Sequence, residues 1–228
     1  MSKYLEFNTP ATKQAMELAS DFRLKSQGLT DLDRVFWNLP DEALYEEAIF
    51  RNEAKLSKLG PLVVNTGKHT ARAAADKFIV QEQSTNDKIW WGAYNRPFSS
   101  EKFNQLMGRV QAFCQGEELF VQDCYVGADP DYKMPIRIIT EKAWHSLFAR
   151  NMFITTEDRD ELKKFVPDFT VICLPSFKTE PAIDGTRTET GIILNFAQRT
   201  AIIANSLYGG EIKKSVFTLL NFLLTFED

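Results

Sequence analysis

The chain has 228 residues, of which 44% are hydrophobic and 25% are charged, and its formal net charge is −4. A chain of this length buries a core as one large domain or two small ones, and this composition excludes intrinsic disorder. The slightly acidic balance excludes a general affinity for nucleic acid or for an anionic membrane, but it leaves room for a local basic site that binds an acidic metabolite.

The first third of the sequence predicts helices at its start and strands around a polar connection. Four elements are expected: a helix from Thr9-Pro10 to Gly28, a helix over 41–51 after a proline, and strands over 62–65 and 77–80. The helix ends rest on capping and proline signals, and the strands on short runs of β-branched and aromatic residues. The polar connection over 66–76 carries most of the candidate chemistry.

The next segment predicts a capped helix followed by most of a sheet. Ser99 can cap a helix that ends at Gly116, with one apolar stripe formed by Phe103, Leu106, Met107, Val110 and Phe113. The later expectations are strands over 119–126, 136–140, 169–174, 191–196 and 201–206, and a helix around 144–148. The last two strands are spaced as a hairpin. Strands and helices therefore alternate irregularly, which predicts an α/β fold with a mixed sheet flanked by helices.

A closing helix is expected from Gly209-Gly210 to Phe226. Its second half is apolar except for a narrow stripe of Thr218, Asn221 and Thr225. A helix that is apolar almost all round expects cover on nearly every side. Self-association through residues 211–226 is therefore one hypothesis.

The cysteines and the termini indicate the compartment. Cys114, Cys124 and Cys173 are widely spaced without a CxxC pair, which is typical of reduced thiols and not of a disulfide framework or a zinc site. The start of the chain has no signal-peptide run, and no segment approaches the roughly 20 apolar residues of a membrane span. We expect a soluble, cytoplasmic protein.

The segment from Tyr208 to Lys214 is the first candidate site. Its glycine pair lets backbone approach a ligand where a helix begins, and free N–H groups and the positive end of the helix dipole face that ligand. Lys213 and Lys214 lie in the first turn, where the dipole and the adjacent cation disfavour the charged amine. A neutral lysine amine can bind a metal or accept a proton. On pattern alone, two solvated lysines are the commoner interpretation.

The other polar candidates give weaker signals. Gly67-Lys68-His69 fails the phosphate-loop pattern, because Leu62 stands at its first glycine and His69 at its Ser/Thr, and no other segment matches. His69 and His145 form no HxH or HxxxH pair, which argues against a self-contained metal site. His145 is expected to pack or to be hydrogen-bonded, whereas His69 fits a solvated or a catalytic residue. Trp90-Trp91 is expected to be a buried anchor.

Several stretches, in order, resemble the amino-terminal half of the ATP-dependent phosphoenolpyruvate carboxykinases. They are Leu39–Ala48, Val64–Arg72, Asp76–Val80, Ile89–Gly92, Phe120–Asp123, Gly127–Pro130, Arg137–Glu141, Ala143–Asn151 and Tyr208–Phe217. Together they cover nearly the whole chain from about Leu32 onward. The most specific are Gly209-Gly-Glu-Ile-Lys-Lys214 and Trp144-His-Ser-Leu-Phe-Ala-Arg-Asn151.

The resemblance implies an enzyme of gluconeogenesis, a carboxy-lyase that converts oxaloacetate and ATP to phosphoenolpyruvate, carbon dioxide and ADP. Arg72 would bind a substrate carboxylate, and Tyr208 would hydrogen-bond the substrate or the departing carbon dioxide. Lys214 would ligate Mn²⁺ or Mg²⁺ next to the substrate and the ATP phosphates, and Lys213 would neutralise developing negative charge.

Two departures from the family pattern qualify this expectation. The family loop resembles HTGRSPKDK, whereas residues 69–77 read HTARAAADK, so that alanine stands at 71 in place of glycine. If the loop needs a positive φ at that position, Ala71 would misplace Arg72. The sequence also ends at Asp228, where the family's second half brings a metal-binding histidine, the phosphate loop and an aspartate.

Residues 1–228 are therefore interpreted as the amino-terminal, substrate-side domain without the nucleotide-binding domain. We expect the isolated chain to bind ATP and metal at most weakly and not to turn over. Three hypotheses remain open: an inactive part of the carboxykinase, a binding module for oxaloacetate or a similar dicarboxylate, and an interaction protein that pairs through its closing helix.

Overall fold

The computed structural model describes residues 22–226. The predicted helix start at Thr9-Pro10 lies outside these residues. The short helix α2 (Phe22–Lys25) falls within the end of that prediction and is followed by Gly28, whose φ of 70° suits a helix terminus.

Across residues 22–226, the centre of the fold is one mixed sheet of eight strands. In spatial order they are β1 (Arg34–Trp37), β6 (Glu118–Val126), β7 (Met134–Thr140), β8 (Phe169–Leu174), β10 (Thr200–Ala204), β9 (Gly191–Asn195), β4 (Lys77–Gln81) and β5 (Arg96–Ser99). The pairs β6–β7 and β10–β9 are antiparallel and the other pairs are parallel. The predicted fold class, an α/β fold with a mixed sheet flanked by helices, is confirmed.

The helices and a small hairpin surround this sheet. The α-helices are α3 (Asp41–Phe50), α4 (Ser100–Cys114), α5 (Ala143–Met152), α6 (Arg159–Lys163), α7 (Pro181–Asp184) and α8 (Gly210–Phe226). Short 3-10 turns cover Ala74–Asp76, Asn86–Lys88 and Pro130–Tyr132, and a separate hairpin pairs β2 (Ala54–Leu56) with β3 (Leu62–Val64). The predicted strands over 62–65 and 77–80 thus exist but belong to different sheets.

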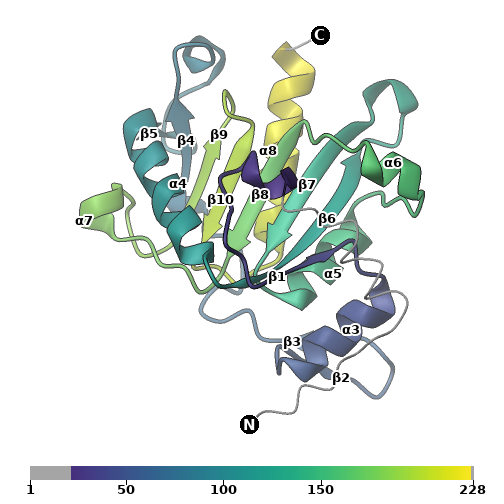
Figure 1. The fold of residues 1–228 in the computed structure, drawn as a ribbon. Helices are drawn as coiled ribbons and strands as arrows, with labels where there is room; N and C mark the ends of the chain where they lie inside the picture. Colours follow the sequence, from purple (N-terminus) through teal and green to yellow (C-terminus); the bar gives the residue numbers. More distant parts are fainter. Residues whose placement is uncertain (1–21, 227–228) are drawn as a thin grey trace.

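Two apolar layers cover the sheet, with α4 and α8 on opposite sides of it (Figure 1), and a third apolar cluster joins α3, α5 and the paired strands β1 and β6. The all-buried strand β8 explains this arrangement, because successive side chains of a strand point to opposite faces. Ile172 and Leu174 pack in the layer of α4, whereas Val171 and Cys173 pack in the layer of α5 and α8. Ser99 caps α4 by accepting a hydrogen bond from the Lys102 N–H, as the sequence predicts.

The closing helix α8 buries one side against the sheet and leaves part of its other side open. Ile212, Val216 and Leu219 are buried, while Phe217 is 54% exposed and Phe226 is 43% exposed. The sheet therefore buries much of the apolar surface of α8. The hypothesis of self-association through this helix stays a prediction.

A buried ion pair lies inside the sheet. Arg137 on β7 donates from Nε and Nη2 to the two carboxylate oxygens of Asp123 on β6, at 2.7 Å and 2.9 Å. Trp37 Nε1 donates to the same carboxylate at 3.1 Å, and both charged side chains are at most 2% exposed. The planar guanidinium suits this two-pronged contact, which is what makes burial of two charges tolerable.

Two further findings complete the comparison with the sequence. The expectation of a buried tryptophan pair is wrong for Trp90, which is 86% exposed, while Trp91 is half-buried and donates from Nε1 to the Asn86 carbonyl. A helix long and apolar enough to cross a bilayer does not occur between residues 22 and 226.

Candidate functional site

The loop between β3 and β4 and the start of α8 meet at a pocket of about 370 Å³. It is lined by Arg72, Tyr208, Gly210, Lys213, Lys214 and Phe217. The four residues singled out from the sequence, Arg72, Tyr208, Lys213 and Lys214, thus share one pocket although Arg72 is more than 130 residues away along the chain. Their chemical roles remain predictions.

The glycine pair before α8 makes room for this pocket. A Cβ atom at Gly210 would collide with the ring of Tyr208. A Cβ atom at Gly209 would lie 3.2 Å from Trp144 and 3.3 Å from Phe148 on α5, which is tighter than ordinary packing. The two glycines therefore leave room for the Tyr208 ring over the first turn of α8 and for close packing of that turn against α5.

Two carboxylates hold the loop that carries Arg72. The backbone N–H of Ala73 donates to Oε1 of Glu211, in the first turn of α8. Asp76 is buried and accepts hydrogen bonds from Arg187 Nε at 3.1 Å and from Thr188 Oγ1 at 3.1 Å. The loop is thus tied both to α8 and to the segment that enters β9.

The alanine that replaces the family's glycine does not require an unusual backbone. Residues with positive φ in the described chain include Gly67 of this loop, but Ala71 is not among them. The condition under which Ala71 would misplace Arg72, a required positive φ, is therefore not met.

A fourth cation, which the sequence interpretation missed, lies beside the pocket. Burial lowers the pKa of Lys77, and the nearby positive charges of Lys214 and Arg72 lower it further. Lys77 lines an adjoining pocket of about 320 Å³ together with Lys214 and Phe217. Lys77 is the first residue of β4, directly after the polar loop. The sequence pattern there does not distinguish a lysine beside a pocket from a lysine exposed to solvent at the end of a strand.

A buried acid stands behind these cations. Glu211 is 5% exposed, and burial raises its pKa, although the Ala73 N–H and the charge of Arg72 act in the opposite direction. The acid contacts the loop backbone and does not line the pocket. The pocket therefore presents three positive side chains to a ligand, and no carboxylate lines it among residues 22–226.

The residues of this pocket do not by themselves fit a divalent cation. Mn²⁺ and Mg²⁺ prefer carboxylate, carbonyl and water oxygens, and the side chains of the pocket offer two amines, a guanidinium and one phenol. Lys214 Nζ lies 4.1 Å from the centroid of the Phe217 ring, a cation–π contact. Among the residues that the structure describes, no group of three or more His, Cys, Asp or Glu side chains could hold a metal. The predicted role of Lys214 as a metal ligand requires partners beyond these residues.

The two histidines lie outside this pocket. His145 is fully buried on α5 and donates from Nε2 to the Leu207 carbonyl at 3.0 Å, and burial lowers its pKa to about 4. The prediction of a packed, hydrogen-bonded residue is confirmed. His69 is half-buried, and its Nε2 lies 3.2 Å from Oγ1 of Thr190.

Comparisons with known proteins agree with this picture. The family model described as phosphoenolpyruvate carboxykinase matches residues 33–228. Proteins named phosphoenolpyruvate carboxykinase (ATP) are 51% identical over 201 residues in Geobacter metallireducens, 47% over 204 in Pelobacter propionicus and 44% over 205 in Thermus thermophilus. These alignments cover 88%, 90% and 89% of this chain but 38%, 38% and 39% of the relatives. The chain therefore spans about two fifths of the length of these relatives.

Proposed function

The chain belongs to the phosphoenolpyruvate carboxykinase (ATP) family, and from this premise we propose that it forms the substrate-side part of an enzyme that acts on oxaloacetate. In that reaction oxaloacetate and ATP give phosphoenolpyruvate, carbon dioxide and ADP. The observation that carries the proposal is the single pocket in which Arg72, Tyr208, Lys213 and Lys214 meet.

The chemistry of these side chains suits a dicarboxylate. The guanidinium of Arg72 can donate two parallel hydrogen bonds to one carboxylate, a geometry that an ammonium group cannot offer. The phenol of Tyr208 can donate to a second oxygen of the ligand. Lys213 and Lys214 add positive charge on the side where negative charge develops as the enolate forms, which stabilises that state.

Positioning of Arg72 follows from the contacts of its loop. Glu211 and Asp76 fix the backbone on either side of the loop's last turn, so the arginine is presented from a held segment. Holding the reactants in a productive orientation is a large part of catalysis in phosphoryl transfer. Phosphates and metal ions also have to be positioned, and the pocket residues do not provide for them alone. We therefore propose that the isolated 228-residue chain binds the substrate but does not turn over.

The binding claim is tested by calorimetry with oxaloacetate. Arg72→Ala should weaken binding by about tenfold or more, because a hydrogen bond to a charged group is worth about 1.5–3 kcal/mol. Arg159→Ala removes an exposed arginine on α6 and is the matched control. Equal affinities of the two variants would refute the assignment of the pocket.

Turnover is tested separately by following phosphoenolpyruvate release from oxaloacetate and ATP. The chain must be purified free of host carboxykinase. Release that scales with the concentration of the chain and disappears in Lys214→Ala would overturn the proposal that the chain is inactive alone.

One observation favours a second candidate function, an interaction module. Phe217 and Phe226 on α8 are about half exposed, and aromatic residues in such positions are typical of contact surfaces. Under this alternative the chain would associate through α8, either with itself or with a chain that carries the rest of the enzyme. Light scattering that shows a monomer at all concentrations, also after addition of a full-length relative, would exclude it.

A further inference from the structure

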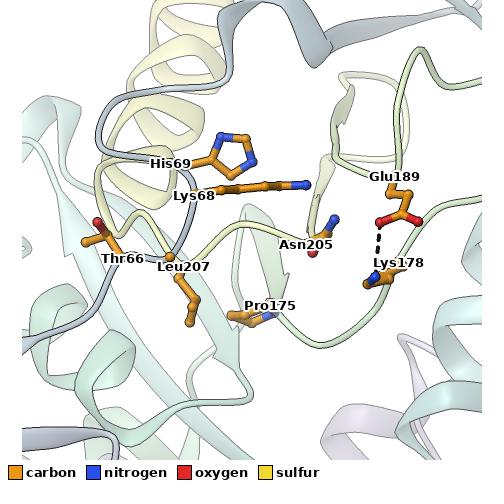
Figure 2. Close-up of a pocket in the computed structure, with 9 residues that line it drawn as sticks. Thr66, Lys68, His69, Pro175, Lys178, Glu189, Asn205 and Leu207 are labelled. Carbon is orange, nitrogen blue, oxygen red and sulfur yellow. Dashed lines mark ion pairs between the residues drawn. The ribbon is translucent and has the colours of Figure 1, made fainter.

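A second pocket of about 370 Å³ lies beside the first and shares no lining residue with it. It is lined by Thr66, Gly67, Lys68, His69, Pro175, Lys178, Glu189, Asn205 and Leu207. The lining comes from three parts of the chain: the loop after β3, the connections around β8 and β9, and the segment between β10 and α8. Figure 2 shows the Lys68 side chain extending towards the side of the pocket where Asn205, Lys178 and Glu189 lie.

Positive charge predominates in this pocket. Lys68 and Lys178 are ammonium groups, and Glu189 is the one carboxylate among the lining residues. Lys178 and Glu189 form an ion pair of 3.1 Å in which the side chains are 62% and 54% exposed. Exposed pairs of this kind are weak, so Lys178 can turn to a stronger anionic partner. With His69 protonated, Lys68, His69 and Lys178 outweigh the charge of Glu189 by two, and a dianion would balance that excess.

The wall around His69 is fixed by a buried hydroxyl. Thr190 is fully buried, and its Oγ1 lies 3.2 Å from Nε2 of His69 and 3.3 Å from the carbonyl of Asn205, to which it donates. Asn205 adopts a positive φ of 54° and is held by a hydrogen bond from its N–H to the Leu174 carbonyl. These hydrogen bonds therefore hold the His69 imidazole and residue Asn205 in fixed positions at the wall of the pocket. Pro175 adds an apolar floor.

The electrostatic setting of His69 leaves its protonation responsive to a bound charge. Burial lowers the pKa of His69, the charge of Lys68 lowers it further, and the charge of Asp76 acts in the opposite direction. A negative charge bound between Lys68 and Lys178 would act in the opposite direction and favour the imidazolium. The same ring can donate to an oxyanion once it carries its second proton.

We propose that this second pocket binds a small dianion, either a phosphate group or a short dicarboxylate, between Lys68, His69 and Lys178. Lysine ammonium groups serve phosphate and carboxylate alike, because they act as point charges without a fixed fork. The apolar floor accommodates the carbon chain of a dicarboxylate or of an organic phosphate. The site is distinct from the proposed substrate pocket, since the two pockets have no lining residue in common.

Nuclear magnetic resonance offers a direct test, because His69 and His145 are the only histidines of the chain. The full chain with isotope-labelled histidine is titrated with inorganic phosphate and, separately, with succinate, against chloride at equal ionic strength. We expect a saturable shift of the His69 ring signals and a higher midpoint of their pH titration. The buried His145 should not respond. Saturation by phosphate alone, by succinate alone or by both identifies the anion and supports the site.

Two variants decide where the anion binds. Lys68→Ala combined with Lys178→Ala should weaken the effect on His69 by about tenfold or more, since charged contacts of this kind carry most of the affinity for a small anion. Both lysines are exposed, so the double variant should fold. Arg72→Ala should leave the effect unchanged.

Each contrary result overturns the proposal. A His69 signal that fails to saturate with either probe excludes a site. An unchanged response in the double lysine variant excludes the assigned cations. Loss of the His69 response in Arg72→Ala would place the anion in the first pocket. The expected result is the opposite one: Arg72→Ala loses oxaloacetate binding but keeps the His69 response, which shows that the two pockets bind separately.

Discussion

Protonation of His145 is expected to destabilise the fold strongly at acidic pH. The ring is fully buried, its Nε2 donates to the Leu207 carbonyl, and Sγ of Cys173 lies 3.8 Å from Nδ1. Because Nε2 carries the proton, Nδ1 accepts from the thiol, and a second proton at Nδ1 would break this contact and bury a charge. Burial accordingly lowers the pKa of His145 from 6.5 to about 4.

The size of the effect follows from linkage between protonation and folding. In the unfolded chain the imidazole gains its proton near the ordinary pKa of 6.5, whereas in the folded chain it does so only near 4. Between these values the unfolded state binds more protons than the folded state. The contribution of His145 to stability therefore falls as the pH falls through this window, and it is constant above the window. At about 1.4 kcal/mol for each pH unit, the full loss is about 3 kcal/mol, a large part of the stability of an ordinary domain.

The assay compares urea unfolding of the wild-type chain and His145→Gln, which cannot titrate, near pH 7.5 and near pH 4.5. Carboxylates titrate in both proteins, so only the difference between them reports on His145. The wild type should lose about 2.5 kcal/mol more than the variant over this range. His69→Gln is the control, and its pH profile should stay closer to that of the wild type than the profile of His145→Gln does, because His69 is only half-buried.

Parallel pH profiles of the wild type and His145→Gln would refute the reasoning. If the variant does not fold, the titration of His145 in the wild type is read directly by magnetic resonance. A midpoint near 6.5 would then contradict the structure, since a fully buried neutral ring cannot retain its solution behaviour.

Two predictions concern stability and are checked by denaturant unfolding at neutral pH. Phe103→Ala on α4 should cost about 3–5 kcal/mol because the ring is fully buried, while Met107→Ala, at a half-buried position of the same helix, should cost clearly less; equal costs would contradict the assigned core face. Asp123→Asn should cost about 3–5 kcal/mol because it leaves the buried Arg137 guanidinium without its carboxylate, whereas the exposed Asp131→Asn should change little; a small effect at Asp123 would show that the pair is less buried than described.

The long elements could be predicted from sequence because their own residues decide them. The strand predicted over 169–174 coincides with β8, and the capped apolar stripe of α4 fixes that helix within two residues. The short strands β1, β2 and β5 were missed, since three or four residues are too few for a period-2 pattern. β5 even contains Pro97, which is tolerated because this strand lies at the edge of the sheet. β1 and β5 exist because the longer strands β6 and β4 supply their hydrogen bonds, whereas β2 pairs with the equally short β3.

The candidate site, too, could be predicted from sequence pattern only where its residues are close together in the chain. Tyr208, Lys213 and Lys214 lie within one turn-to-helix segment, so local spacing alone predicts that they are neighbours. Their proximity to Arg72 depends on long-range contacts, such as the pair between Asp76 and Arg187, 111 residues apart. The periodicity of the sequence contains no information on such long-range contacts, and only the family resemblance indicated that Arg72 lies near the other three residues. Lys77 was missed for the same reason, because its neighbours are set by where β4 lies in the sheet.

The position of the two buried acids explains how an acidic chain can present a basic pocket. Glu211 and Asp76 are each 5% exposed, and their oxygens are engaged by backbone, arginine and threonine donors of the surrounding loops. The two acids hold the loop without lining the pocket, whereas Arg72 and the two lysines line it. These anchors use the Ala73 backbone and the Asp76 side chain, so they do not depend on the side chains that differ from the family pattern at positions 71 and 73–75. The altered loop is therefore held next to α8 and β9 by contacts that its substituted side chains do not make.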